Sequence, residues 1–206
     1  MRQAFFVFLK RICCWFVYQE AREGVDGMSL YLKSLTSHDG EEVYQMLQEI
    51  DANDNGFTNE VKGMTYEHYL KWLQANAAYA QGLDLNEGMV PQTTYWLFHD
   101  EEPVGYGRIR HFLNENLRKN SGHLGYAISS SHRGKGYGYT LLGLLIHKCI
   151  ELGIEPIQVG VNNSNERSNA LVKRQGGIVH SRTEKKNIYK VETERFLHQW
   201  EGWDNH

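Results

Sequence analysis

A glycine-rich connection between a strand pattern and a long helical pattern constrains the fold of this chain most. The segment AISSSHRGKGYGYTLLGLLIHKCIELG, residues 127–153, passes from a strand through Arg133-Gly134-Lys135-Gly136-Tyr137-Gly138 into an apolar helical repeat. The first N–H groups of a helix have no partner within it, and the helix dipole is positive there. Glycines have no Cβ, so an anion can approach their backbone closely. The loop therefore predicts either a phosphate site or a solvated turn.

The glycine spacing excludes two common nucleotide-binding motifs. The loop has no Gly-x-x-x-x-Gly-Lys-Ser/Thr pattern, and its glycines lie at i, i+2 and i+4 rather than in Gly-x-Gly-x-x-Gly. Taken alone, the loop therefore favours the solvated turn. Its context, with a strand before it, a helix after it and a second matched motif downstream, favours the phosphate site.

The composition is typical of a globular protein with one domain. The chain has 206 residues, of which 41% are apolar and 23% charged, and its net charge is −3. There is no basic excess that would indicate nucleic acid as a partner. The three cysteines form no disulfide framework, which predicts a reducing, cytoplasmic location. Neither C-x-x-C nor H-E-x-x-H is present, so we expect no metal site.

The order of the patterns predicts a mixed α/β domain. Alternation and turn residues predict strands at 29–35, 93–100, 104–113, 123–129 and 154–161, followed by a strand pair within 177–192. Helical spacing predicts helices within 41–50, 65–82 and 165–175, besides the helix after the glycine loop. The face of the 65–82 helix that we expect to be buried carries Tyr66, Tyr69, Leu70, Leu73 and Ala77.

The first 27 residues differ from the rest of the chain. Their stretch AFFVFLKRICCWFVY is too short and too charged for a membrane span, and no small-residue cleavage site follows it. It is an interfacial or partner-binding helix, an extra core segment, or upstream sequence from a wrongly assigned start. We favour the last interpretation. We therefore expect residues 1–27 to be a dispensable extension and residues 28–206 to form a single domain.

The segment DANDNGFTNEVK, residues 51–62, imitates a calcium-binding loop. Asp51, Asn53, Asn55 and Gly56 are in the register of an EF-hand loop. The twelfth position of such a loop requires a bidentate Glu, and Lys62 stands there. The segment is therefore predicted to be a polar loop without calcium.

Two motifs together resemble the GNAT N-acetyltransferases. Arg133-x-x-Gly136-x-Gly138 resembles the family's Arg/Gln-x-x-Gly-x-Gly/Ala signature. Asn165-x-x-Ser168, followed by Ala170-Leu171 and Gly176-Gly177, resembles its second cofactor element. The segments RIRHFLNENL and NERSNALVKRQGG narrow the resemblance to a bacterial branch of predicted acetyltransferases. The resemblance covers roughly residues 29–195.

The resemblance implies a fold and a cosubstrate. The fold is a mostly antiparallel sheet that is splayed between its fourth and fifth strands and flanked by helices. Acetyl-CoA lies in the gap, with its pyrophosphate on the loop amides and its pantetheine beside the fourth strand. The residues implied to bind acetyl-CoA are Ile128, Ser129, Arg133, Gly134, Lys135, Gly136, Tyr137, Gly138, Asn165 and Ser168.

The resemblance also implies an activity. It implies transfer of an acetyl group from acetyl-CoA to a primary amine by direct attack in a ternary complex. The implied acceptor is a small-molecule or peptide amine. The resemblance leaves open whether the protein forms a homodimer. The alternative is a non-catalytic acyl-CoA-binding module that senses or regulates. Val172 supports that alternative, because it stands where the family often carries the Tyr that protonates the leaving thiolate.

Three catalytic questions stay open in the sequence. His123 is either the base that neutralises the amine or a hydrogen-bonded structural histidine. His111 and Asn114 either line the acceptor site or cap a loop, and we favour the acceptor site. The missing acid is replaced by Tyr137, by Tyr139 or by a water molecule.

Overall fold

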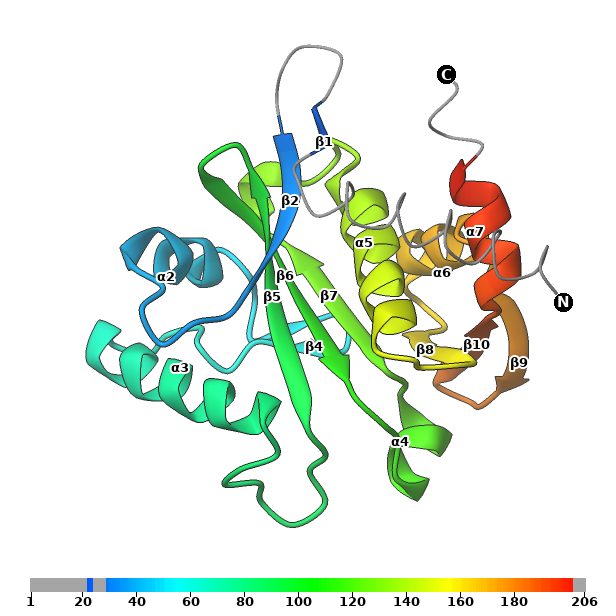
Figure 1. Ribbon diagram of the computed structural model, residues 1–206, viewed down its shortest axis with the longest axis horizontal. Coiled ribbons are helices and arrows are strands. Elements are labelled where there is room, and N and C mark those ends of the chain that lie inside the picture. Colours follow the sequence, from blue (N-terminus) through cyan, green and yellow to red (C-terminus); the bar gives the residue numbers. More distant parts are fainter. Residues whose placement is uncertain (1–21, 24–28, 202–206) are drawn as a thin grey trace, which may run out of the picture.

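The computed structural model describes residues 22–23 and 29–201 as a mixed α/β fold (Figure 1). The first antiparallel sheet consists, in spatial order, of β1 (Arg22–Glu23), β2 (Ser29–Ser34), β5 (Gln92–His99), β6 (Glu102–Arg110) and β7 (Leu124–Ile128). The second sheet consists, in spatial order, of β8 (Ile157–Asn162), β10 (Lys186–Val191) and β9 (Ile178–Arg182). A separate hairpin is formed by β3 (Asn53–Asp54) and β4 (Phe57–Thr58).

Helices cover both faces of the first sheet (Figure 1). α2 (Glu41–Gln48) and α3 (Tyr66–Ala80) lie on one face, and α5 (Tyr137–Glu151) lies on the other. α6 (Glu166–Arg174) contacts α5 and β8. The shorter helices are α4 (Glu115–Asn120), which follows β6, and α7 (Thr193–Glu201), which follows β10. A single 3-10 turn, η1 (Ser130–His132), precedes the glycine loop.

Strand β5 separates two hydrophobic cores, because successive side chains of a strand point to opposite faces. Tyr95 and Leu97 belong to the core beneath α5. Trp96 and Phe98 belong to the core beneath α2 and α3. Both faces of the sheet are therefore covered, which explains why β5 is apolar at consecutive positions.

The longest helices follow from local sequence signals. The side chain of Thr65 caps α3 by accepting a hydrogen bond from the His68 N–H. α5 is apolar around most of its circumference because the sheet, α6 and Phe196 of α7 pack against it. Its buried residues are Leu141, Leu142, Gly143, Leu145, Ile146 and Cys149.

The structure confirms the predicted fold class and corrects some details. α4 and α7 were not indicated by the sequence patterns. The face predicted for α3 is partly wrong, because Tyr66 and Leu70 are each 36% exposed while Trp72 and Asn76 are buried. The segment predicted to be a polar loop at 51–62 contains the β3–β4 hairpin.

The predicted extension, residues 1–27, lies almost entirely outside the described residues. Its described part is Arg22–Glu23, which pairs with Ser29 and Leu30 of β2. The role of the extension and the boundary at residue 28 therefore stay predictions. Across residues 22–23 and 29–201, no helix is both long and apolar enough to cross a membrane.

The carboxylate of Asp39 ties the start of α2 to the first sheet. Its Oδ2 accepts hydrogen bonds from Trp96 Nε1 at 2.6 Å and from the Thr36 N–H at 2.8 Å. Its Oδ1 accepts from Lys33 Nζ at 2.8 Å and from Thr36 Oγ1 at 3.0 Å. Burial alone would raise the pKa of Asp39, but the hydrogen bonds from Lys33, Thr36 and Trp96 outweigh it and lower the pKa.

We predict that Asp39→Asn lowers the free energy of unfolding by about 1–3 kcal/mol, because the amide places a donor against Lys33. Because the pKa of Asp39 is lower in the folded state, the ionised carboxylate stabilises the wild type at neutral pH. This contribution is lost as acid protonates the carboxylate, so the difference between the two proteins should shrink at acidic pH. Urea unfolding of both proteins at neutral and acidic pH measures this difference. Lys33→Ala is the control and should cost less, because the Lys33 side chain is 45% exposed. Equal urea midpoints for Asp39→Asn and the wild type would contradict the assignment.

Candidate functional site

The two sheets meet at one end of β7 and β8 and separate toward the other. At the closed end, the His123 N–H donates to Gln158 O at 2.8 Å. The backbones approach so closely that a Cβ on Gly122 would lie 2.3 Å from Gln158 O, and one on Gly160 would lie 2.5 Å from Ser121 O. Beyond this contact β7 and β8 belong to different sheets. This confirms the predicted splay between the fourth and fifth major strands.

His123 is part of the contact that closes the cleft. Its Nδ1 accepts a hydrogen bond from the Gln158 N–H at 2.9 Å, so the proton of the neutral ring lies on Nε2. Burial, followed by the charges of Arg110 and Arg118, lowers the pKa of His123 to about 4. A base with such a pKa is poorly matched to an amine near neutral pH. The geometry favours the structural role of His123, and its role as a base stays a prediction without geometric support.

The glycine loop presents a row of open backbone donors. In the part of the chain that the structure describes, the N–H groups of residues 134–138 have no hydrogen-bond partner. Gly134 and Gly136 have φ angles of +82° and +86°, and a Cβ on either would meet no atom within 4 Å. Gly136 is the N-cap of α5, so the donors lie at the positive end of the helix dipole. This arrangement suits an anion such as a diphosphate.

The charged and aromatic residues of the loop point in different directions. Arg133 donates to Ile128 O at 3.1 Å and pairs with Asp54 of the hairpin at 2.9 Å. Lys135 is exposed beside the open amides. The Tyr137 ring lies 5.4 Å from the His99 ring, and Arg174 lies 4.7 Å above the Tyr139 ring. Neither tyrosine lines the cleft between β7 and β8.

The open edge of β7 offers fewer backbone groups than the sequence predicted. Ser129 is buried, and its N–H and Oγ both donate to Val104 O on the β6 side. Because backbone groups alternate along a strand, those of Ile128 and Tyr126 face the gap. The Ile128 carbonyl already accepts from Arg133, which leaves its N–H for a ligand. Of the two residues predicted to bind the pantetheine arm, Ile128 has its backbone N–H facing the gap. The backbone N–H of Ser129 is instead bonded to β6 within the first sheet.

The start of α6 forms the other side of the cleft. Asn165 caps α6, because its Oδ1 accepts from the Ser168 N–H at 3.1 Å. Both Asn165 and Ser168 line the cleft. Val172 is fully buried one turn later and has no polar group to offer. The structure therefore places Asn165 and Ser168 at the cleft, and their contact with acetyl-CoA stays a prediction.

The β3–β4 hairpin covers the mouth of the cleft and bridges the two sheets. Asn162 Nδ2 of β8 donates to Asn55 O at 2.8 Å. The Phe57 ring packs so closely over β7 that a Cβ on Gly125 would lie 3.1 Å from it. The cleft has a volume of about 100 Å³. The hairpin therefore narrows the cleft on the face opposite α5.

Tyr126 places an unsatisfied hydroxyl group inside the cleft. Its side chain packs against the core beneath α5 and lines the gap. The hydroxyl oxygen is buried and forms no hydrogen bond of normal geometry. Burial raises the pKa of Tyr126 to about 12, and a weak hydrogen-bonding interaction with the Ser168 side chain opposes the shift. Buried hydroxyls are rarely left unpaired, so this group is available to a ligand.

His111 and Asn114 lie outside the lining of this cleft. His111 Nε2 is 2.8 Å from Thr93 Oγ1, and burial lowers the pKa of His111. Asn114 caps α4 by accepting from the Leu117 N–H, and its Nδ2 donates to Gly88 O at 2.9 Å. Their contact with an acceptor stays a prediction, since both side chains already have local partners.

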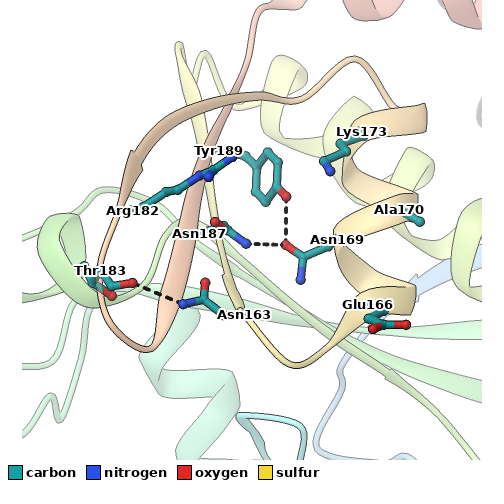
Figure 2. Close-up of a pocket in the computed structure, with 9 residues that line it drawn as sticks. All are labelled: Asn163, Glu166, Asn169, Ala170, Lys173, Arg182, Thr183, Asn187 and Tyr189. Atoms are coloured by element: carbon teal, nitrogen blue, oxygen red, sulfur yellow. Dashed lines mark hydrogen bonds between the residues drawn. The ribbon is translucent and has the colours of Figure 1, made fainter.

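A larger hollow of about 690 Å³ lies on the flank of α6 away from α5 (Figure 2). At its floor, Asn169 Oδ1 accepts from Tyr189 Oη at 2.7 Å and from Asn187 Nδ2 at 3.0 Å. Asn169 Nδ2 donates to Asn162 O and Asn165 O. These bonds join α6 to the second sheet and use all the polar groups of Asn169, so we assign the hollow a structural origin. In the described ranges, no group of three or more His, Cys, Asp or Glu side chains could hold a metal ion.

We predict that the folded protein titrates His123 near pH 4, which NMR of the ring protons measures. Unfolded His123 takes up a proton near pH 6.5. The stability from neutral burial is therefore complete above pH 6.5 and is lost as the pH falls toward 4.

Two substitutions separate the contributions of the His123 ring. His123→Asn keeps an acceptor for Gln158 and should remove the pH dependence without lowering stability at pH 7. His123→Ala also loses that acceptor and should cost about 1–3 kcal/mol. A titration of His123 near pH 6.5 in the folded protein would contradict this account.

Comparison with known proteins agrees with this geometry. The profile of the Acetyltransferase (GNAT) family matches residues 45–177. No curated protein sequence matches the chain. Among solved structures, RimL, the ribosomal L7/L12 alpha-N-protein acetyltransferase in complex with coenzyme A, is similar with a TM-score of 0.61 and 18% identity. The alignment covers 79% of this chain and 93% of RimL.

Two further structures share the fold. The Campylobacter jejuni N-acetyltransferase PseH in complex with acetyl coenzyme A has a TM-score of 0.55 and 14% identity, over 80% of this chain and 99% of PseH. The microcin C7 self immunity acetyltransferase MccE, in complex with acetyl-CoA and AMP, has a TM-score of 0.59 and 16% identity. The alignment covers 81% of this chain and 93% of MccE. The family match spans more than half of the chain and coincides with the glycine loop and the parted strands. The chain belongs to the GNAT acetyltransferase family.

Proposed function

We propose that this protein is an acetyl-CoA-dependent N-acetyltransferase that moves an acetyl group to a primary amine by direct attack. The observation that carries the proposal is the row of unpartnered N–H groups at residues 134–138 beside the parted strands. The loop supplies a diphosphate site, and the gap between β7 and β8 admits an extended chain. The structures of RimL, PseH and MccE, which contain coenzyme A or acetyl-CoA, support this choice of ligand.

Residues on both sides of the gap would hold acetyl-CoA. The amides of residues 134–138 would bind the pyrophosphate, and the exposed Lys135 adds positive charge beside them. Ile128 would offer its N–H to the pantetheine arm. Asn165 and Ser168 face the same space from α6. Arg133 would have to exchange Asp54 for phosphate to take part.

We predict that coenzyme A raises the melting temperature of the wild type and that Gly136→Ala removes this effect. A Cβ at Gly136 points into the open space where the diphosphate is proposed to bind. Gly153→Ala is a matched control, because Gly153 also has a positive φ, +69°, and open space around its Cβ. Both variants should lose similar intrinsic stability. Only Gly136→Ala should lose the response to coenzyme A. If ATP stabilised the wild type as much as coenzyme A does, the assignment of the ligand would be contradicted.

Tyr126 is our candidate for the hydrogen-bond donor to the leaving sulfur. Helical side chains lean toward the N-terminus of their helix, so a tyrosine at position 172 would place its hydroxyl over the turn that contains Ser168. The buried hydroxyl of Tyr126 lies beside Ser168 and comes from β7 instead. Tyr126 would thus supply, from the strand, the group that Val172 cannot supply from the helix.

The proposed reaction balances without any further reactant. The amine nitrogen forms a bond to the thioester carbonyl carbon, and the carbon–sulfur bond breaks with its electron pair going to sulfur. The nitrogen loses one proton, and the sulfur gains one through solvent. The Tyr126 hydroxyl donates a hydrogen bond to the sulfur as its negative charge develops.

We predict that Tyr126→Phe lowers turnover by about a hundredfold. Stability should change little, because the variant removes a buried hydroxyl that interacts only weakly with the Ser168 side chain. A second measurement is independent of turnover. Calorimetry should show weaker binding of coenzyme A to Tyr126→Phe but unchanged binding of desulfo-coenzyme A. An equal loss for both ligands would show that Tyr126 shapes the cleft rather than contacting sulfur.

A non-catalytic acyl-CoA-binding module is the competing function, and the fully buried Val172 favours it. A thiol-release assay with a panel of primary amines separates the two. Release of coenzyme A that depends on an amine supports the enzyme. Tight coenzyme A binding without turnover on any amine supports the module.

A further inference from the structure

We propose that the acceptor amine carries an anionic group, a carboxylate or a phosphate, and that Arg108, Arg110 and Lys186 bind this group. These three residues are called the cationic recess below. The proposal rests on the proposed N-acetyltransferase function and names the chemical class of its acceptor. All three residues line the cleft between the parted sheets.

The cations of the recess lack acidic partners. Among residues 22–23 and 29–201, no carboxylate forms an ion pair with Arg108, Arg110 or Lys186. The acid that lines the same cleft, Asp54, is already paired with Arg133. The recess therefore concentrates positive charge that the described protein does not neutralise.

The two arginines are held in place by neutral groups. Arg110 Nη1 donates to Gly122 O at 2.9 Å and lies 3.4 Å from Ser121 Oγ. Arg108 Nη2 donates to Thr58 O and to Tyr106 Oη, both at 3.0 Å. Arg108 Nε is buried and has no partner. These contacts fix the guanidinium groups but leave donor capacity for a ligand.

The three cations are close enough to influence one another. Burial, together with the charge of Arg108, lowers the pKa of Arg110 to about 10. Burial and then the charge of Arg110 lower the pKa of Lys186. Like charges that are partly buried together oppose folding unless a counter-ion joins them. A bound carboxylate or phosphate would offset this cost, and the planar fork of arginine matches both groups.

The recess lies on the acceptor side of the sheet. Tyr106 belongs to the core beneath α2 and α3, whereas Ile109 belongs to the core beneath α5. Alternation along β6 therefore places Arg108 and Arg110 on the same face as Tyr106 and the hairpin. The glycine loop at the start of α5 lies on the opposite face, whereas Asn165 and Ser168 of α6 line the same cleft as the recess. An acceptor entering beneath the hairpin would therefore meet the recess on the side of the cleft away from the glycine loop.

The recess also suits the chemistry of the amine. Acetyl transfer requires a neutral nitrogen, and nearby positive charge lowers the pKa of an ammonium group. An anionic substituent would hold the acceptor in the recess while the same cations favour its neutral amine. A dicationic acceptor, such as a polyamine, would be repelled.

Paired acceptors test the proposal. Phenylalanine is compared with phenethylamine, and phosphoethanolamine with ethanolamine, because each pair differs by one anionic group. We expect a higher kcat/KM for the anionic member of at least one pair. Lys186→Met and Arg110→Met should reduce that preference by about tenfold or more, the usual effect of losing a charge-assisted hydrogen bond. Lys185→Met is the matched control, because Lys185 is the exposed residue directly before Lys186 and does not line the cleft.

A binding experiment is independent of turnover. Inorganic phosphate is added to the protein saturated with coenzyme A, so that the glycine loop is already filled. Phosphate should raise the melting temperature of the wild type and of Lys185→Met, but not that of Lys186→Met. Equal or better turnover of the neutral amines, or equal phosphate shifts in all three proteins, would overturn the proposal. Intact coenzyme A binding with no turnover on any amine would instead contradict the proposed function, and the phosphate shift would still decide whether the recess binds anions.

Discussion

The contact between β7 and β8 at Gly122, His123 and Gln158 determines how the rest of the molecule is arranged. It joins the two sheets at one end through backbone groups that only glycine allows to approach so closely. Because no further ladder forms between these strands, their other ends separate and leave backbone groups of β7 unpaired. Unpaired strand edges favour the addition of an extended ligand. The cleft is therefore a consequence of where the sheets are joined.

The two faces of this cleft have different chemistry. The face of α5 and α6 offers open amides, the Asn165 cap and the Tyr126 hydroxyl, which suit a phosphate-bearing thioester. The face of the hairpin offers cations that form no ion pair with a carboxylate in the described part of the chain. His123 is held in the contact that joins the sheets, so we do not assign it the role of base. Instead, we propose that the positive charges of Arg110 and Lys186 lower the pKa of the acceptor ammonium group and thereby favour the neutral amine. The proton would then leave through water rather than to a dedicated side-chain base.

Local signals made most of the fold and part of the site predictable. The glycine loop and the Asn165 motif were recognisable because their residues act within a few positions of one another. The hairpin was also marked by Asn55-Gly56, whose φ angles of +52° and +94° fit the two-residue turn that Asn-Gly favours. The same Asn55-Gly56 pair fits both a calcium-loop register and this turn, and the structure shows the turn.

Other features depend on contacts between distant segments, which no local pattern contains. Arg133 and Asp54 are 79 positions apart, and the bond between Gln158 and His123 spans 35. The sequence marks Tyr126 only as a strand residue, because its buried hydroxyl meets Ser168 only in the folded structure. Nothing in the sequence indicates that Lys186 of β10 lies near Arg110 of β6, because 76 positions separate them.

Hydrogen–deuterium exchange with and without acetyl-CoA tests the central claim most directly, because it locates the ligand on the chain. The account predicts slower exchange in the glycine loop at 134–138, at the open end of β7 and at the start of α6. Residues 182–189, which run from the end of β9 into β10 and contribute to the flank of α6 at the larger hollow, should be unchanged. Protection confined to that flank, or no protection in the glycine loop at saturating acetyl-CoA, would contradict the account.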